Sequence, residues 1–266
     1  MKSLKASLLI STYNWPSALD LVLKSILAQS TLPCEVIIAD DGSKKETTDL
    51  IKKYQENFPV PLIHVWQEDN GFRLAEIRNK AIARSNAEYI IQIDGDIIIH
   101  KHFIKDHLAF AKKGTFVRAS RSYIGERKSN QILLNKEVNL TYFSSGITNR
   151  LSAIHYPKAW KLFEKNYKKN EPFEIHGCNM AFWREEAIQV NGYNENFVGW
   201  GPEDKEFVVR MLNKGFEKRF IKMGGICFHI WHPENKKPNL KQNEAEFFDA
   251  IAEKRIFCVN GIDKHL

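Results

Sequence analysis

The sequence predicts an α/β protein with a mostly parallel, doubly wound sheet and helices on both of its faces. Short apolar runs alternate with segments of helical periodicity through the first half of the chain, and this alternation is typical of βαβ units. The 266 residues are enough to bury one large core, and neither an internal repeat nor a clear linker divides them. We therefore expect a single domain over residues 1–266.

The first half supplies four strands and the helices that connect them. Pro16 stands where the first helix begins, and apolar residues follow at helical spacing from Leu19 to Leu27. A second helix is predicted through Leu50 and Tyr54, and a third is predicted from Leu74 to Ile82. The expected strands are residues 7–12, 35–40, 61–66 and 89–99.

The second half is less regular. Residues 116–120 are consistent with a strand, and residues 174–188 predict a strand that runs into a helix. Residues 199–212 read as a Gly/Pro loop followed by a helix. The remaining expected elements are strands at 216–221 and 225–232 and a closing helix at 241–256.

Composition limits the classes of function. The 39 Lys and Arg against 32 Asp and Glu give a net charge of +7, which suits nucleic acid, an anionic membrane surface or phosphorylated small molecules, and equally a solvated basic face. The four cysteines show no metal-type spacing, so we expect reduced thiols. No apolar run approaches the roughly 18 residues of a membrane span. The N-terminus lacks the features of a signal peptide, and we expect a cytoplasmic protein.

Polar residues follow each of the four predicted strands of the first half. In open α/β sheets ligands bind beyond the carboxyl ends of the strands, so these positions predict the site. Four polar strand ends together are a stronger signal than one, because a single loop is polar by default. The positions are Thr12, Tyr13 and Asn14; Asp40 to Ser43; Gln67 to Gly71; and Asp94, Gly95 and Asp96.

Asp94 and Asp96 occur in the apolar run YIIQIDGDIII, where unpaired charges would be costly. Two carboxylates at a strand end suit a hard divalent cation, Mn²⁺ or Mg²⁺, that takes further ligands from water and substrate phosphates. Gly95 would let a ligand approach the backbone. Asp40 and Asp41 suit hydrogen bonds from a base or a ribose, and an Asx turn that caps the next helix is the alternative.

Several motifs together resemble a known family. STYNWP, EVIIADDGS, QEDNGFRLAEIRNKAI and YIIQIDGDIIIHKHFI resemble, in this order and spacing, the donor half of a glycosyltransferase family 2 enzyme with the GT-A fold. GWGPEDKEF resembles the acceptor-side motif of β-1,4-galactosyltransferases and of the bacterial chondroitin-polymerase type. The resemblance implies a nucleotide-sugar-binding half at 1–110 and an acceptor-binding and catalytic half at 111–266. Residues 120–170 match no part of the family, and we expect residues 123–167 to form a mobile or acceptor-facing insertion.

The resemblance also implies roles for individual donor-side residues. Thr12 and Asp41 would contact the uracil, and Asp94 would face the ribose or a metal-bound water. Asp96 would bind the metal. Arg78 would lie close to the nucleotide, although a helix-surface arginine is the alternative. The nucleotide-sugar-binding set is Thr12, Tyr13, Asn14, Asp40, Asp41, Arg78, Asp94 and Gly95.

His229 and His232 are the candidates for the remaining metal ligands. Residues three apart in a strand point to opposite faces, so both histidines bind one ion only if the chain turns after Trp231, which Pro233 favours. The family pattern, in which a sulfur or imidazole ligand precedes the metal-binding histidine by three residues, fits both. The alternative is a structural histidine packed beside Trp231.

The acceptor side carries the expected catalytic groups. By resemblance Asp204 is the general base and Glu203 binds sugar hydroxyls, while an acidic first helical turn is the alternative reading of both. Trp200 would stack on a sugar ring, and Gly201 would let its loop move. Pro202 departs from the glycine usual in animal galactosyltransferases. His176 and Asn179, in HGCNMAF, resemble a sugar-contacting strand.

The resemblance implies an inverting, metal-dependent enzyme. It would transfer galactose, GalNAc, GlcNAc or GlcA from a UDP-sugar to a hydroxyl of a glycan or lipid-linked glycan in bacterial surface polysaccharide synthesis. Peripheral contact with the inner membrane fits such an acceptor, and no nucleic acid is expected. A sugar-phosphate nucleotidyltransferase would carry a Gly-rich basic loop near the first strand, and a dinucleotide oxidoreductase would carry GxGxxG; neither is present. A non-catalytic carbohydrate- or nucleic-acid-binding protein leaves Asp94, Asp96 and Asp204 without a task.

Overall fold

The computed structural model describes residues 4–163, 172–233 and 237–266. Its centre is a seven-stranded sheet with the order β10-β6-β9-β4-β1-β2-β3, and a second sheet has the order β5-β11-β7-β8. The strands are β1 (Ala6–Thr12), β2 (Glu35–Asp40), β3 (Leu62–Trp66), β4 (Tyr89–Asp94), β5 (Ile97–Ile99), β6 (Thr115–Ala119), β7 (Arg121–Ile124), β8 (Ile147–Thr148), β9 (Asn179–Trp183), β10 (Glu217–Ile221) and β11 (Cys227–His229).

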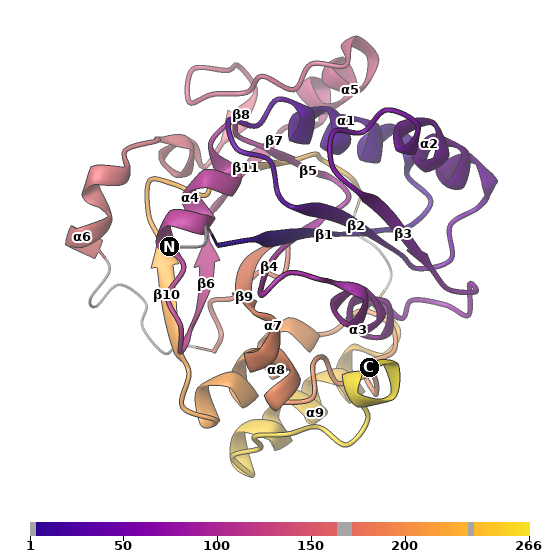
Figure 1. The fold of residues 1–266 in the computed structure, drawn as a ribbon, viewed down its shortest axis with the longest axis vertical. Helices are drawn as coiled ribbons and strands as arrows, with labels where there is room; N and C mark the ends of the chain where they lie inside the picture. The colour runs from indigo at the N-terminus through magenta and orange to yellow at the C-terminus, as the bar shows by residue number, and fades with distance from the viewer. Residues whose placement is uncertain (1–3, 164–171, 234–236) are drawn as a thin grey trace.

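Helices cover both faces of the large sheet, as predicted; α1 and α2 lie on one side and α3, α7, α8 and α9 on the other (Figure 1). The helices are α1 (Pro16–Leu27), α2 (Lys45–Gln55), α3 (Leu74–Arg84), α4 (Phe103–Phe110), α5 (Glu126–Asn135), α6 (Trp160–Phe163), α7 (Arg184–Gln189), α8 (Glu203–Asn213) and α9 (Leu240–Ala252), with short 3-10 turns at Arg150–Ala153, Pro157–Ala159 and Ile262–His265. None of the helices in the described part of the chain is long and apolar enough to cross a membrane.

Two apolar layers enclose the sheet because successive side chains of a strand point to opposite faces. In β1, Leu8 and Ile10 pack with α1 and α4, whereas Leu9 packs with α3, α7 and α8. A third cluster joins the second sheet to α1 and α5. The central strands are therefore apolar on both faces, as parallel strands under two helical layers require.

The prediction of one strand over 89–99 is wrong. β4 ends at Asp94 and β5 begins at Ile97, and the two strands belong to different sheets. The chain turns at Gly95, whose N–H donates to the Ser11 carbonyl oxygen at 2.7 Å. Apolar composition could not reveal the break, because both pieces are buried.

Two further expectations change in the second half, and the direction of one strand is a new observation. The strand expected at 225–232 extends only over Cys227–His229. β9 is antiparallel to β4 and to β6, between which it lies. The mobile or acceptor-facing insertion expected over 123–167 in fact contains the end of β7 and all of α5, β8 and α6. Residues 164–167 of that prediction lie outside the described residues.

Candidate active site

The carboxyl ends of β1, β2 and β4 meet at one edge of the large sheet. β1 pairs in parallel with β2 and with β4, which places Thr12 beside Asp40 and Ser11 beside Asp94. The strand-end residues that the sequence singles out are therefore neighbours in space. The chain leaves β4 at this edge and enters the second sheet, which brings β11 and its histidines to the same place.

Asp96, His229 and His232 form a cluster whose ligand atoms all lie within 4.8 Å of one another. The Nε2 atoms of His229 and His232 lie 3.5 and 3.3 Å from Asp96 Oδ2. Both histidines can reach the aspartate because β11 ends at His229, so His232 is not bound to the alternation of a strand. The Ile230 N–H donates to the Asp96 carbonyl oxygen at 3.0 Å and fixes the two segments together.

The cluster fits a divalent cation. Asp96 Oδ1 is buried and has no hydrogen-bond partner within the described residues, and such an orphan acceptor is costly without a ligand. Burial lowers the pKa of His229, whereas the hydrogen bond to Asp96 raises the pKa of His232 to about 9. One carboxylate and two imidazoles are a donor set that suits Mn²⁺.

Arg78 holds the carboxylates on the other side of the site. Its guanidinium is almost fully buried and lies 3.1 Å from Asp94 Oδ1 and 2.9 Å from Glu203 Oε1, and its Nε donates to Ser11 Oγ. The alternative of a helix-surface arginine is thus wrong. Because burial raises the pKa of Asp94 and Arg78 opposes that rise, we interpret Arg78 as a positioning residue for the site carboxylates.

Glu203 and Asp204 begin α8, where the helix dipole favours negative charge. Glu203 is buried against Arg78, and burial together with the charge of Asp204 raises its pKa to about 7. Asp204 is half-buried and accepts hydrogen bonds from the N–H groups of Gly177 at 2.7 Å and Lys205 at 2.8 Å. Burial raises the pKa of Asp204 as well.

The loop before α8 is attached to α9 through Asn243. The Asn243 side-chain amide donates to the carbonyl oxygens of Val198 and Trp200, and a Cβ added to Gly201 would lie 2.6 Å from Asn243 Cβ. Gly201 therefore permits a close approach to α9. Trp200 is 42% exposed, and Lys237 Nζ lies 4.3 Å from the centre of its ring.

The predicted nucleotide side is present, but its aspartates are already engaged. Asp40 accepts hydrogen bonds from the Ser43 N–H and interacts with His64 Nε2. Asp41 accepts from Gln67 Nε2 and from the Arg73 N–H. Both side chains are buried, so in this structure they bind neighbouring segments of the chain and do not line an open surface.

The four other donor-side residues differ in accessibility. Tyr13 is 48% exposed and donates to Asp69, and Asn14, with φ 47°, binds the Lys44 N–H. Thr12 is buried beside Gly95. A Cβ on Gly95 would lie 2.9 Å from Thr12 Oγ1 and 3.0 Å from the Ser11 carbonyl oxygen. The backbone that approaches Gly95 is therefore that of β1.

The structure separates the two residues of HGCNMAF that were assigned to sugar binding. His176 is half-buried, and burial with the charges of Arg118 and Arg121 lowers its pKa to about 4. Asn179 is fully buried, and its amide donates to the carbonyl oxygens of Ser120 and Gly225. The structure thus does not bring Asn179 to the site surface, because this amide joins β9 to the segments that precede β7 and β11.

Sequence reasoning missed Asn243, Arg121 and the backbone role of Gly177, although Gly177 lies in the HGCNMAF motif that it singled out. Arg121 directly follows the predicted strand at 116–120, so the strand-end rule used for the first half of the chain would have found it. Gly177 acts through its backbone N–H, and Asn243 lies on a distant helix; neither carries a local signal.

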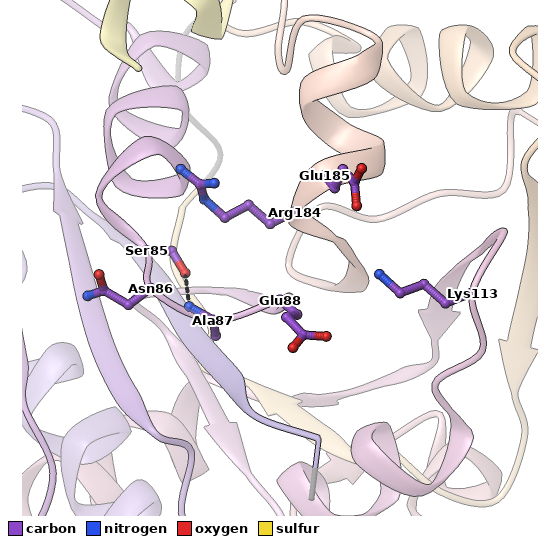
Figure 2. Close-up of a pocket in the computed structure, with 7 residues that line it drawn as sticks. All are labelled: Ser85, Asn86, Ala87, Glu88, Lys113, Arg184 and Glu185. Atoms are coloured by element: carbon purple, nitrogen blue, oxygen red, sulfur yellow. Dashed lines mark hydrogen bonds between the residues drawn. The ribbon is translucent and has the colours of Figure 1, made fainter. Parts of the chain in front are cut away.

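A separate cavity of about 280 Å³ lies away from this edge. Figure 2 shows its lining, in which Glu88 precedes β4 and Arg184 begins α7. This cavity is therefore at the amino end of β4, opposite to the metal cluster. None of the predicted site residues lines it.

A carboxylate–histidine cluster that could hold a metal ion lies beside a second carboxylate pair, at the carboxyl edge of a largely parallel sheet. The family model described as "Glycosyl transferase family 2" matches residues 7–189. The chain belongs to glycosyl transferase family 2. A second model, "N-terminal domain of galactosyltransferase", matches residues 159–233, which include His229 and His232.

Curated relatives are longer proteins. The chain is 28% identical to a chondroitin synthase of Pasteurella multocida (strain Pm70), over 92% of this chain and 26% of that protein. It is 25% identical to a chondroitin synthase of Escherichia coli, over 90% of this chain and 36% of that protein. The chain thus spans between a quarter and two fifths of the length of these relatives.

Solved structures confirm the GT-A fold. GalNAc-T7 with UDP, GalNAc and Mn²⁺ matches with a TM-score of 0.69 and 15% identity, over 99% of this chain and 53% of that chain. Staphylococcus aureus TarS 1-349 with UDP-GlcNAc matches with a TM-score of 0.68 and 17% identity, over 94% and 66%. The mannosyltransferase PcManGT from Pyrobaculum calidifontis, with GDP-Man and Mn²⁺, has a TM-score of 0.62 and 18% identity, over 94% and 64%.

Proposed function

We propose that this chain is the catalytic part of an inverting, metal-dependent glycosyltransferase that moves a sugar from a UDP-sugar to a hydroxyl of a glycan acceptor. The observation that carries the proposal is the cluster of Asp96, His229 and His232 at the edge where Glu203 and Asp204 also lie. Arg78 joins the two parts, since it contacts both Asp94 and Glu203.

The proposed reaction uses the chain's own groups as follows. Asp96, His229 and His232 would hold the cation, which when bound stabilises negative charge on the departing diphosphate. Asp204 accepts the proton of the acceptor hydroxyl while the hydroxyl oxygen forms a bond to C1 of the sugar. The bond between C1 and the diphosphate oxygen breaks on the opposite side, which inverts the configuration at C1.

Asp204 suits the role of base better than Glu203 does. Glu203 is buried in an ion pair with Arg78, whereas Asp204 is half-buried and reachable. The N–H groups of Gly177 and Lys205 fix the Asp204 carboxylate in one orientation. A base with a raised pKa binds the abstracted proton more tightly at neutral pH.

The donor and the acceptor are proposed from the motifs and the relatives. UDP is preferred to GDP because the strand-end motifs resemble those of UDP-sugar enzymes, and galactose, GalNAc, GlcNAc and GlcA are the candidate sugars. The relatives named chondroitin synthase support a glycan or lipid-linked glycan acceptor in bacterial polysaccharide synthesis. Mn²⁺ is the first choice of cation and Mg²⁺ the second.

The test is a donor screen without acceptor. Binding and slow hydrolysis of the four UDP-sugars and of GDP-mannose are measured with Mn²⁺, with Mg²⁺ and with a chelator. We expect Mn²⁺-dependent binding of at least one UDP-sugar, and we expect Asp96→Ala to abolish it. Asp49→Ala is the matched control, because Asp49 is exposed on α2. A wild-type protein that binds no nucleotide sugar under any of these conditions would overturn the proposal.

A further inference from the structure

Arg121, the first residue of β7, has neutral partners. Its Nε donates to Tyr123 Oη at 3.0 Å, and its Nη1 lies 3.1 Å from Cys178 Sγ. The guanidinium carbon lies 5.0 Å from the centre of the Tyr123 ring. Burial raises the pKa of the Cys178 thiol to about 12, so the thiol carries no charge at neutral pH.

No carboxylate within the described ranges lies within 4.0 Å of this guanidinium. The two most buried arginines of the described chain behave differently, since Arg78 contacts Asp94 and Glu203 and Arg210 contacts Glu206. A partly buried cation that lacks an anion is costly. The arrangement is therefore typical of a group that receives its counter-charge from a ligand.

The position of Arg121 identifies the ligand. β7 and β11 pair in parallel, with Arg121 opposite Cys227 and Tyr123 opposite His229. Residues two apart in a strand share a face, so Arg121 lies on the face that carries His229 toward the metal cluster. The rings of Tyr123 and His229 are 6.0 Å apart.

The same guanidinium is close to the proposed base. Cys178, which it contacts, follows Gly177, whose N–H donates to Asp204 Oδ2 at 2.7 Å. Arg121 therefore stands between the metal cluster and Asp204. In the proposed reaction that is where the bond between C1 and the diphosphate breaks.

We propose that Arg121 binds the sugar-linked phosphate of the donor diphosphate and holds the negative charge that this phosphate gains as the bond to C1 breaks. This inference rests on the proposed function. A guanidinium offers two parallel N–H groups to phosphate oxygens, and such charge-assisted bonds strengthen as charge develops on the oxygen. Tyr123 and Cys178 carry no charge, so they fix the orientation of the Arg121 guanidinium without neutralising it.

The test compares nucleotides that differ only in this phosphate. UDP and UMP binding are measured calorimetrically with Mn²⁺ for the wild type, Arg121→Gln and Arg121→Lys. We expect Arg121→Gln to weaken UDP binding about 10-fold or more and to leave UMP binding unchanged, because UMP lacks the second phosphate. The UDP affinity of Arg121→Lys should fall between those of the wild type and Arg121→Gln, since lysine keeps the charge but loses the paired N–H groups of the guanidinium.

Arg127→Gln is the matched control, because it removes the same charge from an exposed position on α5. UDP binding by Arg121→Gln that equals the wild type would overturn the assignment while the proposed function stands. If wild-type protein fails to bind UDP, the proposed function itself is overturned. If Arg121→Gln does not fold, as judged by its thermal transition, Arg121→Lys takes its place. A ratio of UDP to UMP affinity in Arg121→Lys below that of the wild type then supports the assignment, and an equal ratio overturns it.

An anion of the acceptor is the competing ligand for Arg121. Initial rates of the wild type and of Arg121→Gln are therefore also measured with a neutral and with an acidic glycan acceptor, at saturating donor. A rise in KM for the acidic acceptor alone, with UDP affinity unchanged, would overturn the donor assignment.

Discussion

Asp94 and Asp96 lie two residues apart, yet they have different partners. Asp94 is 3.1 Å from Arg78, whereas Asp96 lies 3.3 and 3.5 Å from two histidines. The turn at Gly95 separates them, because it sends the chain from one sheet to the other. The sequence-based assignment of the metal to Asp96, and of a different contact to Asp94, remains a prediction that agrees with this geometry.

Asp204→Asn is expected to reduce sugar transfer by about 100-fold or more while Mn²⁺-dependent UDP binding persists, because only the proton acceptor is lost. Both quantities are measured on the same preparation. Transfer at the wild-type rate would remove Asp204 as the base.

The pH dependence of transfer follows from the raised pKa values of Glu203 and Asp204. A base must be unprotonated, so kcat/KM should fall as pH falls through the pKa of the carboxylate pair. Because burial raises both values, we expect the acidic midpoint above about 4, the ordinary value for a carboxyl group. A pH–rate profile from 4 to 9 tests this. An acidic midpoint at or below the ordinary value contradicts it.

Arg78→Met is expected to destabilise the protein by about 3–5 kcal/mol, because removal of one partner leaves the buried carboxylate of Glu203 and the half-buried carboxylate of Asp94 uncompensated. Urea unfolding at pH 7 measures the change. Arg84→Met, at the exposed end of the same helix, is the control. Equal stability of the two variants would show that Arg78 does not hold these charges.

At the scale of elements, the site depends on two connections between segments distant in sequence. The Gly95 turn joins β4 to β5 beside β1, and the loop before α8 is held by Asn243 of α9. Both connections use a glycine where a second backbone or side chain comes close.

Gly95→Ala should cost about 1–3 kcal/mol of stability and weaken Mn²⁺ binding, because its Cβ would press against Ser11 and Thr12 and displace Asp96. Gly125→Ala is the comparison, since a Cβ there meets one atom at 3.4 Å. Metal titration and thermal unfolding are measured for both. Unchanged Mn²⁺ affinity in Gly95→Ala would show that the turn does not position Asp96.

Asn243→Ala should release the loop around Trp200 and raise the KM for the acceptor several-fold with little change in donor affinity. The reason is that its amide holds the carbonyl oxygens of Val198 and Trp200. Steady-state kinetics with each substrate varied in turn distinguishes the two effects. A rise in the KM for the donor alone would show that the loop acts in donor binding and not in acceptor binding.

At the scale of the whole molecule, the two halves of the chain share one sheet. β9, from the second half, lies between β4 and β6, and α8 packs in the same apolar cluster as α3 and β1. The single domain predicted over residues 1–266 remains a prediction, and it has a direct consequence. The 266-residue chain should unfold in one cooperative transition, whereas a fragment of residues 1–110 should not, because β4 would lose its β9 neighbour.

The strand ends were predictable because the apolar periodicities of strands and of helices, and the polarity of loops, are local properties of the sequence. They sufficed for the helices on both faces and for the neighbouring strand ends at Thr12, Asp40 and Asp94, while the histidine ligands remain a prediction. They could not reveal the second sheet or the break at Gly95, because a buried run reads the same whether or not the chain turns within it.

The sequence by itself determined the α/β class and the family resemblance, and it predicted acidic and histidine site residues, because residue types and their spacing are local properties of the chain. Only the tertiary structure decided that Asn179 is buried, that Arg78 holds two carboxylates and that Arg121 lies between the metal cluster and Asp204. Burial and partners of a charged group depend on segments far apart in sequence. The residues around a charged group in the sequence do not show which distant segments it contacts in the fold.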